Sequence, residues 1–176
     1  MNEYLICPLS FGLEDNGRPN AEARVRCDRA VAVARKLASK EDRIAFVVGG
    51  GWEEFSQTRG VSSFAAAYAE YLRTEHQWTG EVVNLSLPHR TNSVDEILAL
   101  SRAVRQRRRD LRAAGGHLEF YPVAVTSWWH APRVWWIGLL IFGYPIGVRA
   151  SKTTLSWRIA LRELIFHECP GFAKST

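Results

Sequence analysis

The sequence predicts a three-layer α/β/α sandwich built around a mostly parallel five-stranded sheet. Short apolar runs rich in β-branched residues alternate five times with segments of helical period, and turn residues separate them. When a helix follows each strand, the chain returns to the sheet as a parallel neighbour. Repeated alternation therefore favours a parallel sheet with helices on both faces.

Apolar runs bounded by turn residues mark the predicted strands. Pro8 closes the first run, and three consecutive glycines, Gly49 to Gly51, end the second abruptly. The five predicted strands are 4–7, 43–48, 81–85, 118–125 and 144–148.

Helical period and capping residues mark the predicted helices. Asn20 is the expected cap of the first helix, and Ser62 or Ser63 caps an alanine-rich second helix. Ser93 and Glu96 have capping-box spacing at the start of the clearest helix, which two glycines at 115 and 116 stop. The first predicted helix covers residues 21–39. The second runs from its serine cap to residue 74, and the third runs from residue 93 to beyond residue 111. The last two cover residues 131–142 and 154–167.

Length and composition bound the class of protein. The 176 residues suffice for a sizeable core, so we expect a single domain over residues 1–176. The formal charge of +5 suits an anionic partner but is too small to require nucleic acid, and we expect none. The three cysteines lack CxxC spacing, which favours a reducing cytoplasm over disulfides or a metal site.

The N-terminus and the longest apolar run bear on localisation. Glu3 stands where a signal peptide would be positive, so we expect no export signal. The apolar run 134–148 is interrupted by Gly143 and Pro145 and is too short to span a bilayer. It is interpreted as a buried helix, a glycine stop and a new strand. We therefore expect a cytoplasmic protein without a membrane span.

The segment 123–133 organises the predicted site. Its apolar residues end a strand, and Thr126 and Ser127 are hydroxyl residues of the kind that end a strand and cap a helix. Pro132 suits a first helical turn because its missing N–H is not needed there. With almost no loop between strand and helix, His130 comes at the carboxyl edge of the sheet, where open α/β folds bind ligands.

His130 and Arg133 are the candidate chemical groups of this segment. Standing one helical turn apart, they can jointly hold an anion, or His130 can transfer a proton as general acid or base. The alternative is a structural histidine beside an arginine that extends past neighbouring tryptophans. Ser127 is disfavoured as a nucleophile because the GxSxG pattern is absent.

Glycines and arginines supply further candidates for ligand contact. Gly49, Gly50 and Gly51 can let the backbone approach a phosphate, and the alternative is only a tight strand exit. Arg26 or Arg24, on the first helix, can pair with a ligand phosphate or carboxylate. The arginine-rich stretch 105–109 closes a helix and is interpreted as solvated surface. The C-terminal His167-Glu168-Cys169 does not have metal-ligand spacing, and no metal is expected.

The order of these motifs resembles the YdcF/SanA/ElyC-like family, a bacterial domain of unknown function with a Rossmann-like fold. The similarity runs from Tyr4 to Phe166. The resembling pieces are the glycines of Val47–Gly51, Ser63–Ala65 with Tyr71-Leu72, Thr91, the segment Val125–Arg133, and Glu163.

The resemblance implies a Rossmann-like fold and adds S-adenosylmethionine or another nucleotide as an expected ligand. Two positions depart from the family pattern. Phe64 stands where a glutamate is usual, and Ser93-Val94 stand where Glu-Asn follows the threonine. If those polar residues carry chemistry in relatives, the activity of this chain is altered. Many relatives also carry membrane-spanning segments, which are not expected here.

Two functions are therefore expected from the sequence. The first is binding of a small anionic or nucleotide-type ligand at the carboxyl edge, with His130-assisted transfer or hydrolysis. The expected ligand-binding residues are Gly49, Gly50, Gly51, Thr91, Thr126, Ser127, Arg133 and Arg26. The second is a non-catalytic role in partner binding or homodimer formation. Its basis is a tryptophan-rich segment whose four indoles cannot all face inward: Trp128, Trp129, Trp135 and Trp136.

Overall fold

The computed structural model describes residues 2–38, 42–51, 53–87, 89 and 92–153. Their strands are β1 (Asn2–Pro8), β2 (Arg43–Gly51), β3 (Glu81–Leu87), β4 (Glu119–Ser127) and β5 (Gly147–Ser151). Their helices are α1 (Ala21–Leu37), α2 (Glu53–Gln57), α3 (Phe64–Thr74), α4 (Ser93–Ala113) and α5 (Ala131–Phe142). The predicted helix 154–167 lies outside the described residues.

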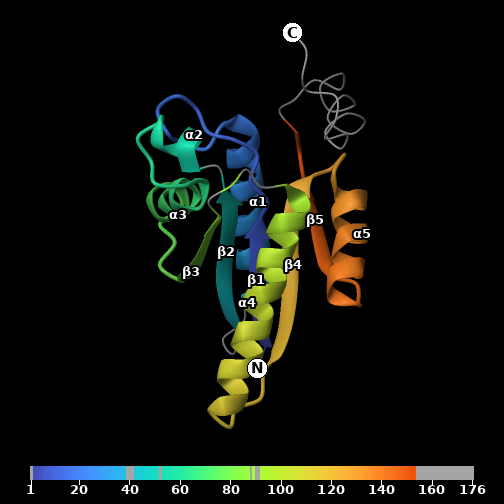
Figure 1. The fold of residues 1–176 in the computed structure, drawn as a ribbon. Helices are drawn as coiled ribbons and strands as arrows, with labels where there is room; N and C mark the ends of the chain where they lie inside the picture. Colours follow the sequence, from blue (N-terminus) through green and yellow to red (C-terminus); the bar gives the residue numbers. More distant parts are fainter. Residues whose placement is uncertain (1, 39–41, 52, 88, 90–91, 154–176) are drawn as a thin grey trace.

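The five strands form one sheet in the order β3-β2-β1-β4-β5, and every neighbouring pair is parallel. Helices α1 and α3 cover one face of this sheet, and α4 and α5 cover the other (Figure 1). The predicted three-layer, Rossmann-like α/β/α class is thereby confirmed. None of the helices in the described ranges is long and apolar enough to cross a bilayer.

The core has two layers, one on each face of the sheet, because successive residues of a strand point to opposite faces. On β1, Ile6 packs with the α1 and α3 side, whereas Leu5 and Cys7 pack with the α4 and α5 side. On β2, Phe46 and Val47 alternate in the same way. The three central strands β2, β1 and β4 are buried on both faces, which explains their continuous apolar runs, whereas the edge strands β3 and β5 are only partly buried.

The strand order reverses at β1, and this reversal positions the site. From β1 the chain proceeds through α1 to β2 on one side, and it later passes through α4 to β4 on the other side. The loops that follow β1 and β4 therefore diverge at the carboxyl edge. In open α/β sheets, ligands bind at such a switch point.

Strand β2 is longer than predicted. Instead of ending the strand, Gly49, Gly50 and Gly51 continue it and pair with Leu85, Ser86 and Leu87 of β3. Gly50 has φ +117°, and a Cβ on Gly51 would overlap the carbonyl oxygens of Leu87 and His89. The glycines are thus needed for a close approach of two backbones, and the expectation of an abrupt strand end is wrong.

Two of the predicted caps are confirmed and one is wrong. Asn20 and Ser63 accept hydrogen bonds from the N–H groups of Ala23 and Ala66 at 3.0 Å. The capping box of α4 is made by Asn92 and Asp95 rather than by Ser93 and Glu96. Both Asn92 and Ser93 are good capping residues, so the pattern fits one position earlier equally well.

The segment after β4 also differs from the prediction. Thr126 and Ser127 belong to β4, and the N-cap position of α5 is His130, whose side chain makes no capping bond. Pro132 lies in the first turn of α5 as predicted. The last described strand is β5, shifted toward the C-terminus from the predicted 144–148.

Helix α5 is not the buried helix that its apolar sequence predicts. Only Val134 and Gly138 of this helix are buried. The helix packs on β4, on the edge strand β5 and on α4, so its opposite side has no described element above it. Its outward apolar side chains are therefore exposed.

Candidate functional site

The carboxyl edge between β1 and β4 gathers polar side chains from four parts of the chain. Ser10 follows β1, Thr126 is near the end of β4, and the first turn of α4 carries Ser93 and Glu96. His130 stands at the start of α5. Parallel strands end at one edge, so residues far apart in sequence meet there.

Glu96 is a carboxylate inside the protein, with only 3% of its surface exposed. It accepts hydrogen bonds from the Ser10 backbone N–H at 3.0 Å and from the Ser10 hydroxyl. Burial raises the pKa of Glu96 to about 7, and the bonds from Ser10 only partly oppose that rise. A carboxyl group with such a pKa can gain or lose a proton near neutral pH.

His130 is held by hydroxyl groups at both ring nitrogens. Nδ1 lies 3.1 Å from Thr126 Oγ1, and Nε2 lies 3.1 Å from Ser93 Oγ. The ring is buried, which limits its contact with water. The imidazole is thus fixed in orientation by β4 and faces a serine hydroxyl on α4.

Trp129 brings an unused hydrogen-bond donor next to this histidine. Its ring stacks on His130 with centroids 5.2 Å apart and planes 23° apart. The indole Nε1–H is buried and has no hydrogen-bond partner within the described part of the chain. A buried unpaired donor costs about 1–3 kcal/mol, so an acceptor from outside the chain, such as water or a ligand, would stabilise this site.

Arg26 lies beneath the edge in a buried ion pair. Its guanidinium lies 3.9 Å from Glu22 and donates to Ser127 Oγ at 2.9 and 3.1 Å. It also donates to the carbonyl oxygens of Leu9 and Ser10 at 3.2 and 3.1 Å. Arg26 therefore positions the loop after β1, and contact with a ligand stays a prediction for this residue.

Ser127 takes part in the same buried network. Its hydroxyl accepts from Arg26 and donates to Glu22. Glu22 also accepts a hydrogen bond from Thr153 at 3.0 Å. The side chain of Ser127 is wholly buried, which agrees with the view that it is no nucleophile.

The other expected site residues are brought together in part. A Cβ on Gly50 would lie 3.2 Å from Ser10 Oγ, so the glycine strand end borders the Ser10–Glu96 pair. Arg133 is half-buried in the first turn of α5, near His130 in sequence. Thr91 lies outside the described residues.

Sequence reasoning missed Ser10, Ser93 and Glu96 as site residues. Glu96 stands beside Ile97 and one helical turn before Leu100, both fully buried. A carboxylate within an inward-facing apolar stripe is a detectable signal for a functional group. Ser10 lies in a polar loop and offers no such signal.

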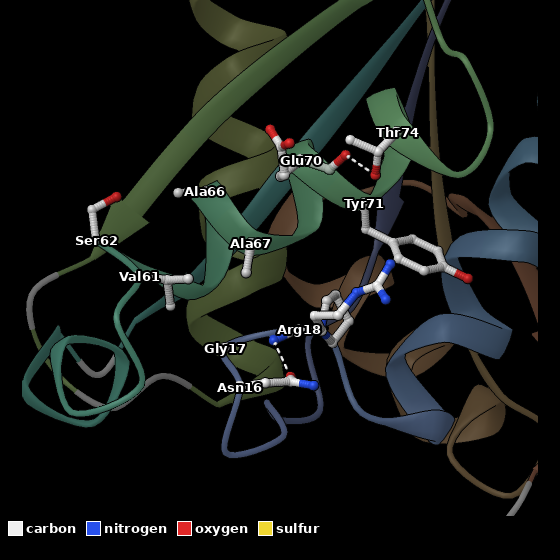
Figure 2. Close-up of a pocket in the computed structure, with 11 residues that line it drawn as sticks. Asn16, Gly17, Arg18, Val61, Ser62, Ala66, Ala67, Glu70, Tyr71 and Thr74 are labelled. Atoms are coloured by element: carbon white, nitrogen blue, oxygen red, sulfur yellow. Dashed lines mark hydrogen bonds between the residues drawn. The ribbon is translucent and has the colours of Figure 1, made fainter.

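Two surface hollows lie away from this edge. One of about 380 Å³ lies between residues 16–19 and α3, and one of about 410 Å³ lies beside Arg108 and Phe120. Figure 2 shows the first, where Thr74 Oγ1 donates to the Glu70 carbonyl oxygen at 3.0 Å. Arg18, which also lines it, bonds to Glu75. Neither hollow is lined by His130 or Glu96, so the site is assigned from its buried polar groups.

Among the described residues, metal ligands do not gather at this edge. Within the described ranges, no three histidine, cysteine, aspartate or glutamate side chains come together as a metal site. Cys7 and Cys27 are buried free thiols, and burial raises the pKa of each.

Comparisons with known proteins leave the family of this chain undecided. Searches of family models, curated proteins and solved structures found no match. Membership of the YdcF/SanA/ElyC-like family stays a prediction. Function is consequently inferred from the side chains at the carboxyl edge.

Proposed function

We propose that this protein binds a small anionic ligand of phosphate or nucleotide type at the carboxyl edge between β1 and β4, where His130 exchanges a proton with it. The observation that carries this function is the fixed imidazole. Thr126 and Ser93 each lie 3.1 Å from one of its nitrogens. A histidine oriented in this way at a ligand edge is suited to general acid or base chemistry.

Several features support an anionic ligand. The chain carries a formal charge of +5, and Arg133 is within one helical turn of His130. The buried indole N–H of Trp129 needs an acceptor, which anions supply.

Thermal unfolding with and without ligands tests this function. The probes are inorganic phosphate, AMP, ATP and S-adenosylmethionine, the last because the family resemblance implies it. A probe at about a hundredfold its Kd should stabilise the folded protein by about 2.7 kcal/mol.

Matched variants locate the binding site. His130→Gln should weaken the shift, whereas His117→Gln, which changes an exposed histidine outside the edge cluster, should leave it unchanged. The function is contradicted if no probe raises the unfolding temperature. It is equally contradicted if both variants respond like the wild-type protein.

Self-association is a second candidate, favoured by the exposed apolar side of α5. We define the tryptophan surface as Trp128, Trp135, Trp136 and Leu140. Trp128 and Trp136 are each 57% exposed, and Leu140 is 70% exposed. Exposed tryptophans with a neighbouring leucine form the kind of patch that anchors protein interfaces.

Sedimentation velocity tests this second candidate. If the tryptophan surface forms a homodimer interface, the wild-type chain should sediment as a dimer at micromolar concentration. Trp136→Glu should then give a monomer, and Arg102→Glu on the exposed side of α4 should not. We take a dissociation constant of about 100 micromolar as the upper limit for a weak specific dimer. A wild-type chain that stays monomeric up to that concentration rules out this candidate.

A further inference from the structure

We propose that Ser93 is a nucleophile activated by His130, so that the site transfers acyl groups from carboxylic esters that carry an anionic group. This role depends on the proton exchange at His130 proposed above and adds a covalent step to it. The juxtaposition of a serine hydroxyl, an imidazole and an orienting hydroxyl carries the inference.

The geometry fits a nucleophile and its base. Ser93 Oγ lies 3.1 Å from His130 Nε2, within hydrogen-bond reach. The tautomer with hydrogen on Nδ1 donates to Thr126 Oγ1 at 3.1 Å and leaves Nε2 to accept the proton of Ser93. Thr126, wholly buried in β4, thus occupies the place that an acidic residue fills in a serine–histidine–aspartate triad.

The position of Ser93 favours it over the other serines of the edge. It is half-buried at the first position of α4, where the helix dipole favours the negative charge that develops on the substrate carbonyl oxygen during attack. Ser127 is wholly buried and bonded to Arg26 and Glu22. Ser10 bonds to the Glu96 carboxyl through both its hydroxyl and its N–H, which ties it to a structural role.

The covalent step conserves atoms and charge. Ser93 Oγ attacks the carbonyl carbon, an Oγ–C bond forms, and the proton of Ser93 passes to His130 Nε2. The C–O bond to the leaving alcohol breaks, and the alcohol takes that proton from His130. Water then attacks the acyl carbon while His130 takes one of its protons. The Oγ–C bond breaks, Ser93 Oγ takes that proton back from His130, and the acyl group leaves as a carboxylic acid.

An alkyl fluorophosphonate tests this inference without knowledge of the substrate. Ser93 Oγ should attack its phosphorus and expel fluoride, and His130 should take up the proton. Intact mass should show a single adduct on the full-length wild-type chain, and peptide mapping should place it on Ser93. His130→Gln should slow labelling by about a hundredfold or more, since general base catalysis contributes at least that factor.

Control variants separate reactivity from folding. Ser86→Ala removes an exposed hydroxyl at the same sheet edge, bonded to Ser63 and Asn84, and should label like the wild type. Thr126→Val should slow labelling without moving the adduct to another residue. The unfolding temperature of each variant shows that it is folded.

The outcome also separates this inference from the binding function. An adduct on Ser10 or on any other residue, or no adduct, overturns the role of Ser93. If Ser93→Ala loses labelling yet keeps its thermal shift with phosphate or nucleotide, both proposals hold. An adduct on Ser93 without any ligand shift supports the nucleophile and contradicts the ligand panel.

Discussion

Ser10 and Glu96, 86 positions apart in the chain, are joined by hydrogen bonds from both the N–H and the hydroxyl of Ser10 to one carboxyl group. This contact ties the loop after β1 to the first turn of α4. From the other face of the sheet, Arg26 bonds the carbonyl oxygens of Leu9 and Ser10. The loop that borders the candidate site is therefore fixed by both helical layers.

Glu96→Gln should change how stability depends on pH. Burial raises the pKa of Glu96 to about 7, above the value near 4.5 in an unfolded chain. The folded protein thus holds a proton that the unfolded chain has lost between these values. The stabilisation is present below pH 4.5 and is lost as pH rises through 7. From pH 4.5 to pH 8 the wild type should lose about 3 kcal/mol relative to Glu96→Gln.

Urea unfolding of both proteins at several pH values measures this difference, because all other titrations cancel in the comparison. Glu70→Gln, which changes an exposed carboxylate on α3, should keep the wild-type pH dependence. Parallel stability curves for the wild type and Glu96→Gln would show that Glu96 does not titrate in this range.

Arg26→Met should destabilise the protein by about 3–5 kcal/mol, because it removes the buried cation beside the Glu22 carboxylate and the hydrogen bonds that the guanidinium donates to Ser127, Leu9 and Ser10. Arg24→Met is the matched control on the same helix. Arg24 bonds to Glu14 at 2.6 Å near the surface, and its loss should cost at most about 1 kcal/mol. Equal effects of the two variants in urea unfolding would refute the importance of the buried pair.

Gly50→Ala should destabilise the protein more than Gly60→Ala does. Both glycines have positive φ, at +117° and +72°, which strains an alanine by about 1–3 kcal/mol. Only Gly50 adds crowding, because its Cβ would lie 3.0 Å from Phe64 Cβ, whereas the space at Gly60 is open. Thermal or urea unfolding compares the two, and a smaller loss at Gly50 would contradict the described packing.

Trp129→Phe should leave the unfolding free energy of the ligand-free protein within about 1 kcal/mol of the wild type. The variant removes the unpaired indole N–H, a gain that offsets the lost packing. The indole N–H of Trp78 donates to the Glu81 carbonyl oxygen at 3.4 Å. Trp78→Phe should therefore destabilise the protein more than Trp129→Phe does. The response of Trp129→Phe to an anionic probe should also be weaker, and an unchanged response would mean that its N–H faces no ligand.

The sequence was sufficient to predict the fold class because each element has a local signal. Hydrophobic period marked the strands and helices, and Asn20 and Ser63 marked two helix starts. The glycines of β2 were assigned to a turn because glycine is rare in strands, and their pairing with β3 depends on a backbone contact from elsewhere in the chain. Local propensity carries no information on such a contact.

The candidate site was predictable only in part, for the same physical reason. His130 follows a strand directly and precedes Pro132, which marked its position locally. Its partner Ser93 lies 37 positions earlier, and the pairing of Ser10 with Glu96 spans 86 positions. These contacts arise because the first turn of α4 lies between the loops after β1 and β4. That position depends on the order of the strands in the sheet, which local sequence does not show.

The site contains two hydrogen-bonded pairs, Ser93 with His130 and Glu96 with Ser10. One residue of each pair lies in the first turn of α4. Three positions on a helix with 3.6 residues per turn place the two side chains on nearly the same side. One inserted residue between them would rotate Glu96 by about 100° relative to Ser93 and break one of the two pairings. Relatives that keep this site must therefore keep the length between these two residues, and the Ser-x-x-Glu spacing is a signature by which they can be recognised.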